Sequence, residues 1–370
     1  MPLRSGARRP SESASRRSEC YRRLGGMSIS RIRSAALVTL TALSTMALAA
    51  CDHQRSIAPA PTPSVRPTAP APAPSGQILW FEREPRSGYE WSFFLYLPSG
   101  VGPSSSSSTP LLVMPNNTGT IDDQAGVHRA AALKQSFSWR SYAERLHAAI
   151  LVPTFPRPAA RPDLYTHALD RDTLLVQSGD LRRLDLQLIG MIEAAHRFMG
   201  APVDKKILIF GFSAGAMFAN RFTLLHPELV LAAAIGSPGG WPMAPQSTWN
   251  SEPLRYPLGA DDLSTLTGKP LNFDALQRVR FFFFLGAKDE NDSLTFRDGY
   301  DTEDEALAMR LLGRTPVERW SLAERMYREA GANAIFRLYP DVGHDVTDNM
   351  DSDVLEFFAN AMASRAPTAR

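Results

Sequence analysis

The most constraining feature of the sequence is an apolar run that leads into a glycine-flanked serine and then into a helix-forming segment. Residues 205–210 read KKILIF, the next five are Gly211-Phe212-Ser213-Ala214-Gly215, and AMFANRFTLL follows. Where a buried strand turns sharply into a helix, the turn residue lies at the carboxyl edge of a sheet. Glycines on both sides let the strand and the helix approach closely, because they carry no side chain. The segment predicts a sheet protein that presents Ser213 at a strand end.

The same alternation of short apolar runs and helical spacing continues from residue 77 onward. Two runs around a turn at residues 85–88 predict an antiparallel hairpin. Later runs predict buried strands at residues 110–116, 148–155, 205–213, 229–237, 279–286 and 334–340. Helical spacing predicts helices at residues 141–148, 181–199, 214–226, 316–330 and 351–364. This order is typical of an α/β fold, with a mostly parallel central sheet and helices on both faces, in one domain over residues 77–366.

The N-terminal residues read as a targeting segment. Residues 35–50 form an uncharged run of 16 residues, shorter than the roughly 20 that a helix needs to cross a bilayer. A basic segment precedes this run from Met27 onward, as in a secretory signal peptide. Its end, Leu48-Ala49-Ala50-Cys51, resembles the lipobox of bacterial lipoproteins, which implies lipidation of Cys51. The alternatives are a plain signal peptide with an incidental cysteine, or a buried hydrophobic helix. Residues 1–50 are interpreted as an upstream extension and signal peptide.

Composition narrows the possible partners. Residues 51–76 are rich in Pro and Ala and predict a tether behind Cys51, so we expect a protein anchored by lipid to a membrane of the bacterial envelope, facing the periplasm in a Gram-negative host. Without residues 1–50 the chain carries more acidic than basic residues, which argues against nucleic-acid binding. The two cysteines, Cys20 and Cys51, leave none for a disulfide or a cysteine-based metal site in the body. The predicted strands are not followed by a Gly-rich phosphate-binding loop, so we predict no nucleotide cofactor.

Ser213 needs a base, because a serine hydroxyl is a poor nucleophile near neutral pH. Of the seven histidines, His344 follows the last predicted strand in the turn Asp341-Val342-Gly343-His344, where ligand sites of α/β sheets gather. His226 stands at a helix end, which favours a solvated or capping role. His128 and His167 are expected in loops, where they touch either substrate or solvent. We therefore predict His344 as the general base.

The acid that orients this base should follow the strand between Ser213 and His344. Residues 286–293 (GAKDENDS) offer Asp289, Glu290 and Asp292. Asp289 is the first choice, Asp292 the main rival and Glu290 a third possibility. A carboxylate here would hold one imidazole tautomer and stabilise the imidazolium.

Attack of a serine on a carbonyl group creates an oxyanion, which needs two N–H donors. The residue after the nucleophile, Ala214, supplies one. The second should come from the loop after the third strand, PNNTG at residues 115–119, and we assign it to Asn117. The alternative is that these residues are simply typical of a turn and supply no donor.

With these residues in hand, the chain resembles the α/β-hydrolase superfamily over nearly all of residues 77–363, and within it the secreted group of feruloyl esterases and polyhydroxybutyrate depolymerases. The resemblance rests on the motifs IFGFSAG, GAKDEND and YPDVGHD. PNNTG departs from the His-Gly pattern of that group. Residues 240–278, after the sixth strand, stand where the superfamily often inserts a lid. Their Trp241, Trp249 and Tyr256 would either line a pocket or pack as an ordinary exposed insertion.

The resulting hypothesis is a serine esterase that cleaves small-molecule or polymer esters through an acyl-enzyme. A peptidase or a thioesterase on the same fold, or a noncatalytic membrane-tethered binding module, are the alternatives. The intact Ser, Asp and His argue against the last, because a degenerate site usually loses one of them. No metal is needed for this chemistry.

Overall fold

A computed structural model describes residues 76–101, 109–117, 119–200 and 206–364. These residues all belong to one unit, Thr68–Arg370. The predicted signal peptide, Cys51 and the tether up to residue 75 lie outside the described residues. None of the helices within the described ranges combines the length and the hydropathy that a bilayer span requires.

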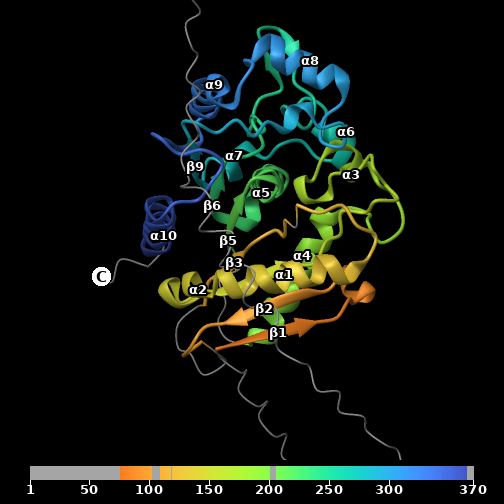
Figure 1. The fold of residues 1–370 in the computed structure, drawn as a ribbon, viewed down its shortest axis with the longest axis vertical. Coiled ribbons are helices and arrows are strands. Elements are labelled where there is room, and N and C mark those ends of the chain that lie inside the picture. The colour runs from red at the N-terminus through yellow and green to blue at the C-terminus, as the bar shows by residue number, and fades with distance from the viewer. Residues whose placement is uncertain (1–75, 102–108, 118, 201–205, 365–370) are drawn as a thin grey trace, which may run out of the picture. The chain divides into compact units, whose positions relative to one another are not determined.

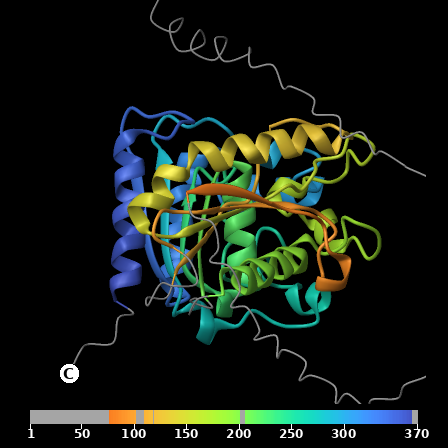
Figure 2. The ribbon, with the colours of Figure 1, turned by 90° about the horizontal axis from the view of Figure 1, so that it is seen from below.

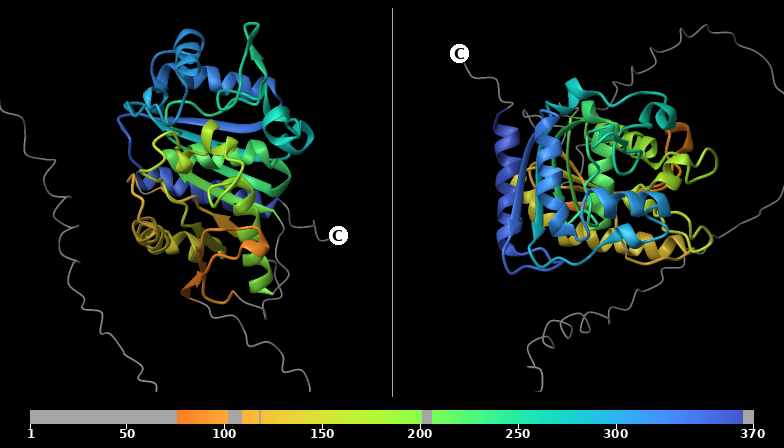
Figure 3. Two further views of the ribbon diagram at one scale, coloured as in Figure 1. Left: turned by 90° about the vertical axis from the view of Figure 1, so that its right-hand side faces the viewer. Right: turned by 90° about the horizontal axis from the view of Figure 1, so that it is seen from above.

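The core of the unit is an eight-stranded sheet in the order β1-β2-β4-β3-β5-β6-β9-β10 (Figures 1 and 3). The strands are β1 Gln77–Phe81, β2 Phe93–Leu97, β3 Leu111–Val113, β4 Ala149–Pro153, β5 Ile207–Phe212, β6 Val230–Gly236, β9 Arg280–Gly286 and β10 Asn333–Tyr339. Strand β2 pairs antiparallel with β1 and β4, and the remaining neighbours are parallel. The predicted mostly parallel sheet, including its opening hairpin, is confirmed.

Each central strand is buried on both faces because its side chains alternate between two cores. In β9, Phe281 and Phe283 pack in one cluster and Phe282 and Phe284 in the other. The helices α4 Leu184–Met199, α5 Ala214–Leu225 and α9 Pro316–Glu329 contribute to the first core. The helices α1 Ala125–Ser138, α2 Arg140–Leu146 and α10 Asp348–Ala363 contribute to the second. Helices thus cover both faces of the sheet (Figure 2).

The sequence places a possible lid-like insertion at residues 240–278, after β6. It holds a short hairpin, β7 Thr248–Trp249 and β8 Glu252–Pro253, and the short helices α6 Leu263–Thr267 and α7 Phe273–Leu276. Trp241 and Tyr256 are fully buried and donate hydrogen bonds to the carbonyls of Leu258 and Leu169. Trp249 is half-buried, with the Arg325 guanidinium 4.7 Å from its ring centre. Trp241 and Tyr256 are therefore core residues rather than an exposed insertion.

The remaining elements lie in the connections. They are the α-helices α3 Arg171–Leu175 and α8 Thr302–Leu311 and the 3-10 helices η1 Pro85–Ser87, η2 Thr166–Ala168, η3 Pro227–Leu229 and η4 Ser293–Thr295. Together with residues 241–258, η2, α8 and α9 form a third apolar cluster against the start of α5. This packing fixes the loops that follow β4, β6 and β9 around Ser213.

Candidate active site

Ser213 occupies a strained turn between β5 and α5. Its φ of 57° and ψ of −128° lie in a region that non-glycine residues rarely adopt, which costs about 1–3 kcal/mol. A Cβ on Gly211 would stand 2.1 Å from the Gly215 carbonyl oxygen, and one on Gly215 would stand 3.2 Å from that of Pro115. Only glycine therefore fits at position 211, and a side chain at 215 would crowd the loop after β3. The turn keeps its shape because Ser213 N–H donates to Gly236 O at 3.0 Å.

His344 lies in the loop after β10 and contacts Asp289, in the loop after β9. Its Nδ1 is 2.9 Å from Asp289 Oδ2 and 3.1 Å from Oδ1. Burial alone would raise the pKa of Asp289. Hydrogen bonds from His344 and from the Asn291 backbone outweigh it and hold that pKa below its usual value. A carboxylate only accepts, so Nδ1 carries the proton and Nε2 is left to face the nucleophile.

Asp292 is engaged elsewhere. Its carboxylate binds the fully buried guanidinium of Arg319 in α9, with Nη2–Oδ2 and Nη1–Oδ1 distances of 2.8 and 3.0 Å. It also accepts from Leu294 N–H and so caps the start of η4. Glu290 is exposed. Of the three candidate acids, the structure brings Asp289 to His344 and uses Asp292 to fasten the loop to α9.

Asn291, which the sequence did not single out, lies between the base and the nucleophile. Its Nδ2 is 2.8 Å from His344 Nε2 and 3.4 Å from Ser213 Oγ. Within the described residues, no direct hydrogen bond joins Ser213 Oγ to His344; the Asn291 amide stands in its place. Nothing in the sequence marks this residue apart from its position two after Asp289.

The two predicted oxyanion donors belong to segments that pack together. Ala214 is the first residue of α5, so its N–H has no partner within the helix. The Cβ position of Gly215 is 3.9 Å from Asn117 Cβ and 3.2 Å from Pro115 O, so residues 115–117 lie against the start of α5. The neighbouring Asn116 is buried and fixes this loop, because its side chain donates to Phe155 O at 2.8 Å and accepts from Phe155 N at 3.1 Å.

A cavity of about 360 Å³ opens beside this loop, between it, the strand end and α1. Asn117 and Phe212 line it on the site's side, and Lys134, Gln135 and Trp139 line it on the helix side. Its mixed lining could hold one part of a substrate that carries both apolar and polar groups.

Two other histidines lie where the sequence did not place them. His128 is in α1 rather than in a loop, and both it and His167 are buried. Burial lowers the pKa of His167 to about 3, and its Nε2 contacts Phe155 O at 2.8 Å. The expectation that these side chains touch substrate or solvent is therefore wrong, since neither reaches the surface.

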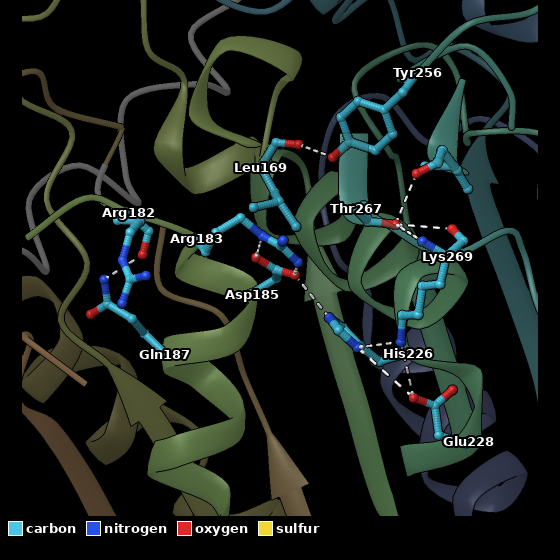
Figure 4. Close-up of polar contacts among 11 residues, drawn as sticks. Leu169, Arg182, Arg183, Asp185, Gln187, His226, Glu228, Tyr256, Thr267 and Lys269 are labelled. Atoms are coloured by element: carbon cyan, nitrogen blue, oxygen red, sulfur yellow. Dashed lines mark hydrogen bonds and ion pairs between the residues drawn. The ribbon is translucent and has the colours of Figure 1, made fainter. Parts of the chain in front are cut away.

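A second Asp–His pair lies inside the unit (Figure 4). His226 Nε2 is 2.9 Å from Asp185 Oδ2, and Arg183 binds the same carboxylate through Nε and Nη2 at 2.8 and 2.6 Å. Burial would raise the pKa of Asp185, but the hydrogen bonds from Arg183 and His226 lower it to about 2. His226 is thus a buried partner of Asp185 rather than a solvated helix cap.

No protein-family model and no curated protein matches the chain in sequence. Among solved structures, it is similar to poly(aspartic acid) hydrolase-1 from Sphingomonas sp. KT-1, with 19% identity, a TM-score of 0.50, and coverage of 76% of this chain and 98% of that one. It also aligns with a poly(3-hydroxybutyrate) depolymerase from Bordetella parapertussis, at 20% identity, a TM-score of 0.48, and coverage of 80% and 93%.

The similarity to poly(aspartic acid) hydrolase-1 and the strand order together identify the architecture. The fold is the α/β-hydrolase fold. Within this fold, Ser213 sits at the turn after β5, Asp289 after β9 and His344 after β10. In the part of the chain that the structure describes, no three His, Cys, Asp or Glu side chains converge as metal ligands would.

Proposed function

We propose that this protein is a serine hydrolase that cleaves carboxylic esters through an acyl-enzyme on Ser213. The observation that carries the proposal is the arrangement of three groups at one edge of the sheet. They are a strained serine at a strand-to-helix turn, a histidine whose Nε2 faces it through one amide group, and a buried carboxylate that holds Nδ1. These are the three groups that base-assisted nucleophilic attack uses: a nucleophile, a general base and a carboxylate that orients the base.

In the first half of the reaction, Ser213 Oγ attacks the ester carbon while its proton moves to His344 Nε2. The negative charge that develops on the carbonyl oxygen is stabilised by the N–H groups of Ala214 and Asn117 and by the partial positive charge at the start of α5. The tetrahedral intermediate then collapses. The alcohol leaves with the proton from Nε2, and the acyl group stays on Oγ.

In the second half, water gives a proton to His344 Nε2 and attacks the acyl carbon. The second tetrahedral intermediate releases the carboxylic acid, and the proton on Nε2 returns to Ser213 Oγ. Asp289 stays ionised throughout and stabilises the imidazolium that forms in each half. Its lowered pKa favours that state.

The test is turnover of p-nitrophenyl esters of short and long acyl chains by the whole protein and by Ser213→Ala. Wild-type turnover that disappears in the variant supports the proposal. Matched thioesters and p-nitroanilides, run in parallel, separate an esterase from a thioesterase or a peptidase. A folded wild type that turns over none of these substrates would indicate a noncatalytic binding module.

We further propose that the chain is anchored through a lipidated Cys51 to the bacterial cell envelope. The support is the sequence alone, with its basic segment, its apolar run and Leu48-Ala49-Ala50-Cys51. Cells fed radiolabelled palmitate should label the wild type and leave Cys51→Ala unlabelled. Equal labelling of both, or of neither, would leave only a secretory signal.

A further inference from the structure

The amide of Asn291 occupies the position that the proton of Ser213 must reach. Its Nδ2 is 2.8 Å from His344 Nε2, closer than its 3.4 Å to Ser213 Oγ. An amide nitrogen can only donate, so the Nε2 lone pair accepts from Asn291. A general base whose lone pair is already engaged cannot accept the serine proton.

The tautomer of His344 makes this contact specific. Because Nδ1 donates to the Asp289 carboxylate, Nε2 is the one nitrogen of the ring that can serve as a base. Asn291 therefore does not disturb the orientation of the imidazole. It only covers the atom through which the imidazole acts.

The backbone around Asn291 is held from several sides. Its own N–H donates to Asp289 Oδ1 at 2.9 Å, Asp289 N–H donates to Gly286 O at 3.0 Å, and Ser293 N–H donates to Gly239 O at 3.0 Å. Arg319 fixes the intervening Asp292. The side chain of Asn291, by contrast, is only half-buried, and its contacts are with Ser213 and His344. Rotation of this side chain can therefore uncover Nε2 while the loop stays in place.

We propose that Asn291 is a cap on the general base, which holds the resting site closed to proton transfer and must rotate away before Ser213 can be acylated. This inference rests on the proposed function, since it assigns a role within the same site. Rotation of the amide out of the space between the two groups would leave Nε2 facing Ser213 Oγ, which could then attack a bound ester. The cap would slow acylation by the cost of one neutral hydrogen bond, about three- to tenfold.

The experiment measures acylation directly. The burst of p-nitrophenolate from p-nitrophenyl acetate and the rate of labelling by a fluorophosphonate are compared for wild type, Asn291→Ala, Asn291→Asp and Glu290→Ala. Glu290 is the exposed neighbour and serves as the matched control. We expect Asn291→Ala to acylate about three- to tenfold faster and Glu290→Ala to match wild type.

A second readout tests the same contact at the hydrogen-bond level. Asn291→Ala removes the donor to Nε2, so we expect the acid limb of its pH–rate profile to lie at higher pH than that of wild type. Asn291→Asp keeps the shape but replaces the donor with a carboxylate that favours the imidazolium. It should move the acid limb further in the same direction and slow acylation at neutral pH.

The outcomes separate this inference from the proposed function. If wild type is labelled on Ser213 but Asn291→Ala acylates at the wild-type rate or more slowly, Asn291 is no cap, and a slower rate would make it a donor to the substrate. If Asn291→Ala does not fold, Asn291→Asp provides the test. A pH–rate profile of acylation equal to that of wild type would then overturn the proposal. If folded wild type is neither acylated nor labelled, it is the proposed function that fails.

Discussion

Two Asp–His pairs among the described residues have nearly the same geometry in very different surroundings. In each, a histidine nitrogen stands 2.9 Å from a buried carboxylate oxygen. The side chain of His344 is 29% exposed, whereas that of His226 is 3% exposed. His344 uses Nδ1 for its carboxylate and turns Nε2 toward Asn291 and Ser213. His226 uses Nε2 for Asp185, and its Nδ1 is 3.5 Å from Lys269 Nζ.

The difference shows that an Asp–His pair alone does not make a catalytic site. Asp185 is shared with Arg183, so its charge is already balanced, and within the described ranges no serine forms a hydrogen bond with its histidine. Asp289 has His344 as its partner, and the other nitrogen of that ring is linked through the Asn291 amide to Ser213. We expect the first pair to stabilise the fold and the second to support turnover, and substitutions can separate the two roles.

The largest effect is expected for Asp289→Asn. This change keeps the shape of the residue but removes the charge that holds the Nδ1–H tautomer and stabilises the imidazolium, so kcat should fall by about 10⁴-fold. Steady-state turnover of a p-nitrophenyl ester measures it, with circular dichroism as the check on folding. Activity within a few fold of wild type would remove Asp289 from the mechanism.

Asp292→Asn should act on stability instead. It leaves the buried guanidinium of Arg319 without its counter-charge, which should lower the free energy of unfolding by about 3–5 kcal/mol. The fraction that remains folded should keep kcat within a few fold of wild type. Urea unfolding and turnover per folded molecule measure the two quantities. A loss of kcat larger than that of Asp289→Asn would show that the two acids have been assigned the wrong way round.

Asp185→Asn is the matched variant for the buried pair. It weakens the hydrogen bonds from Arg183 and His226, and we expect a loss of about 2–3 kcal/mol in the free energy of unfolding. The kcat should stay at the wild-type value, because the contacts of this pair in the described part of the chain do not include Ser213. If kcat instead drops as it does for Asp289→Asn, the two pairs are not functionally distinct.

The same pair predicts a pH dependence of stability. Asp185 has a pKa of about 2 in the folded chain, against an ordinary value near 3.9 in the unfolded chain. Its contribution is therefore fully present above pH 4 and is lost as the pH falls toward 2, by about 2 kcal/mol. Urea unfolding between pH 5 and pH 2 should show this loss in wild type and a shallower one in Asp185→Asn. Equal slopes would mean that Asp185 titrates normally.

The sequence predicts the sheet and the glycine-flanked turn because both depend on local patterns. Continuous apolar runs such as Phe281–Leu285 are strands buried on two faces, and Gly211 fits where a Cβ would be 2.1 Å from a carbonyl oxygen. Helix α1 escaped prediction because its buried positions are His128, Ala132 and Ser136, which give no apolar stripe. Helix α8 was also not predicted, because the only residues it buries are Asp304 and Ala308.

The missing parts of the site depend on contacts between distant residues. Asp289 and Asp292 look alike in sequence, and what separates them is Arg319, 27 residues beyond Asp292. Asn291 matters only because the loop after β9 brings its amide to a histidine 53 residues away. Likewise, His226 is buried because Asp185, 41 residues before it, accepts its hydrogen bond. Spacing along the chain does not encode these partners.

The most direct test of the account is to label the whole protein with a fluorophosphonate and to map the modified residue by mass spectrometry of its peptides. The probe forms a phosphonyl ester with an activated serine and releases fluoride, and it ignores ordinary surface hydroxyls. The account predicts one modified residue, Ser213, with no labelling of Ser213→Ala or of heat-denatured wild type. Absence of label on folded wild type, or labelling that persists in Ser213→Ala, would contradict it.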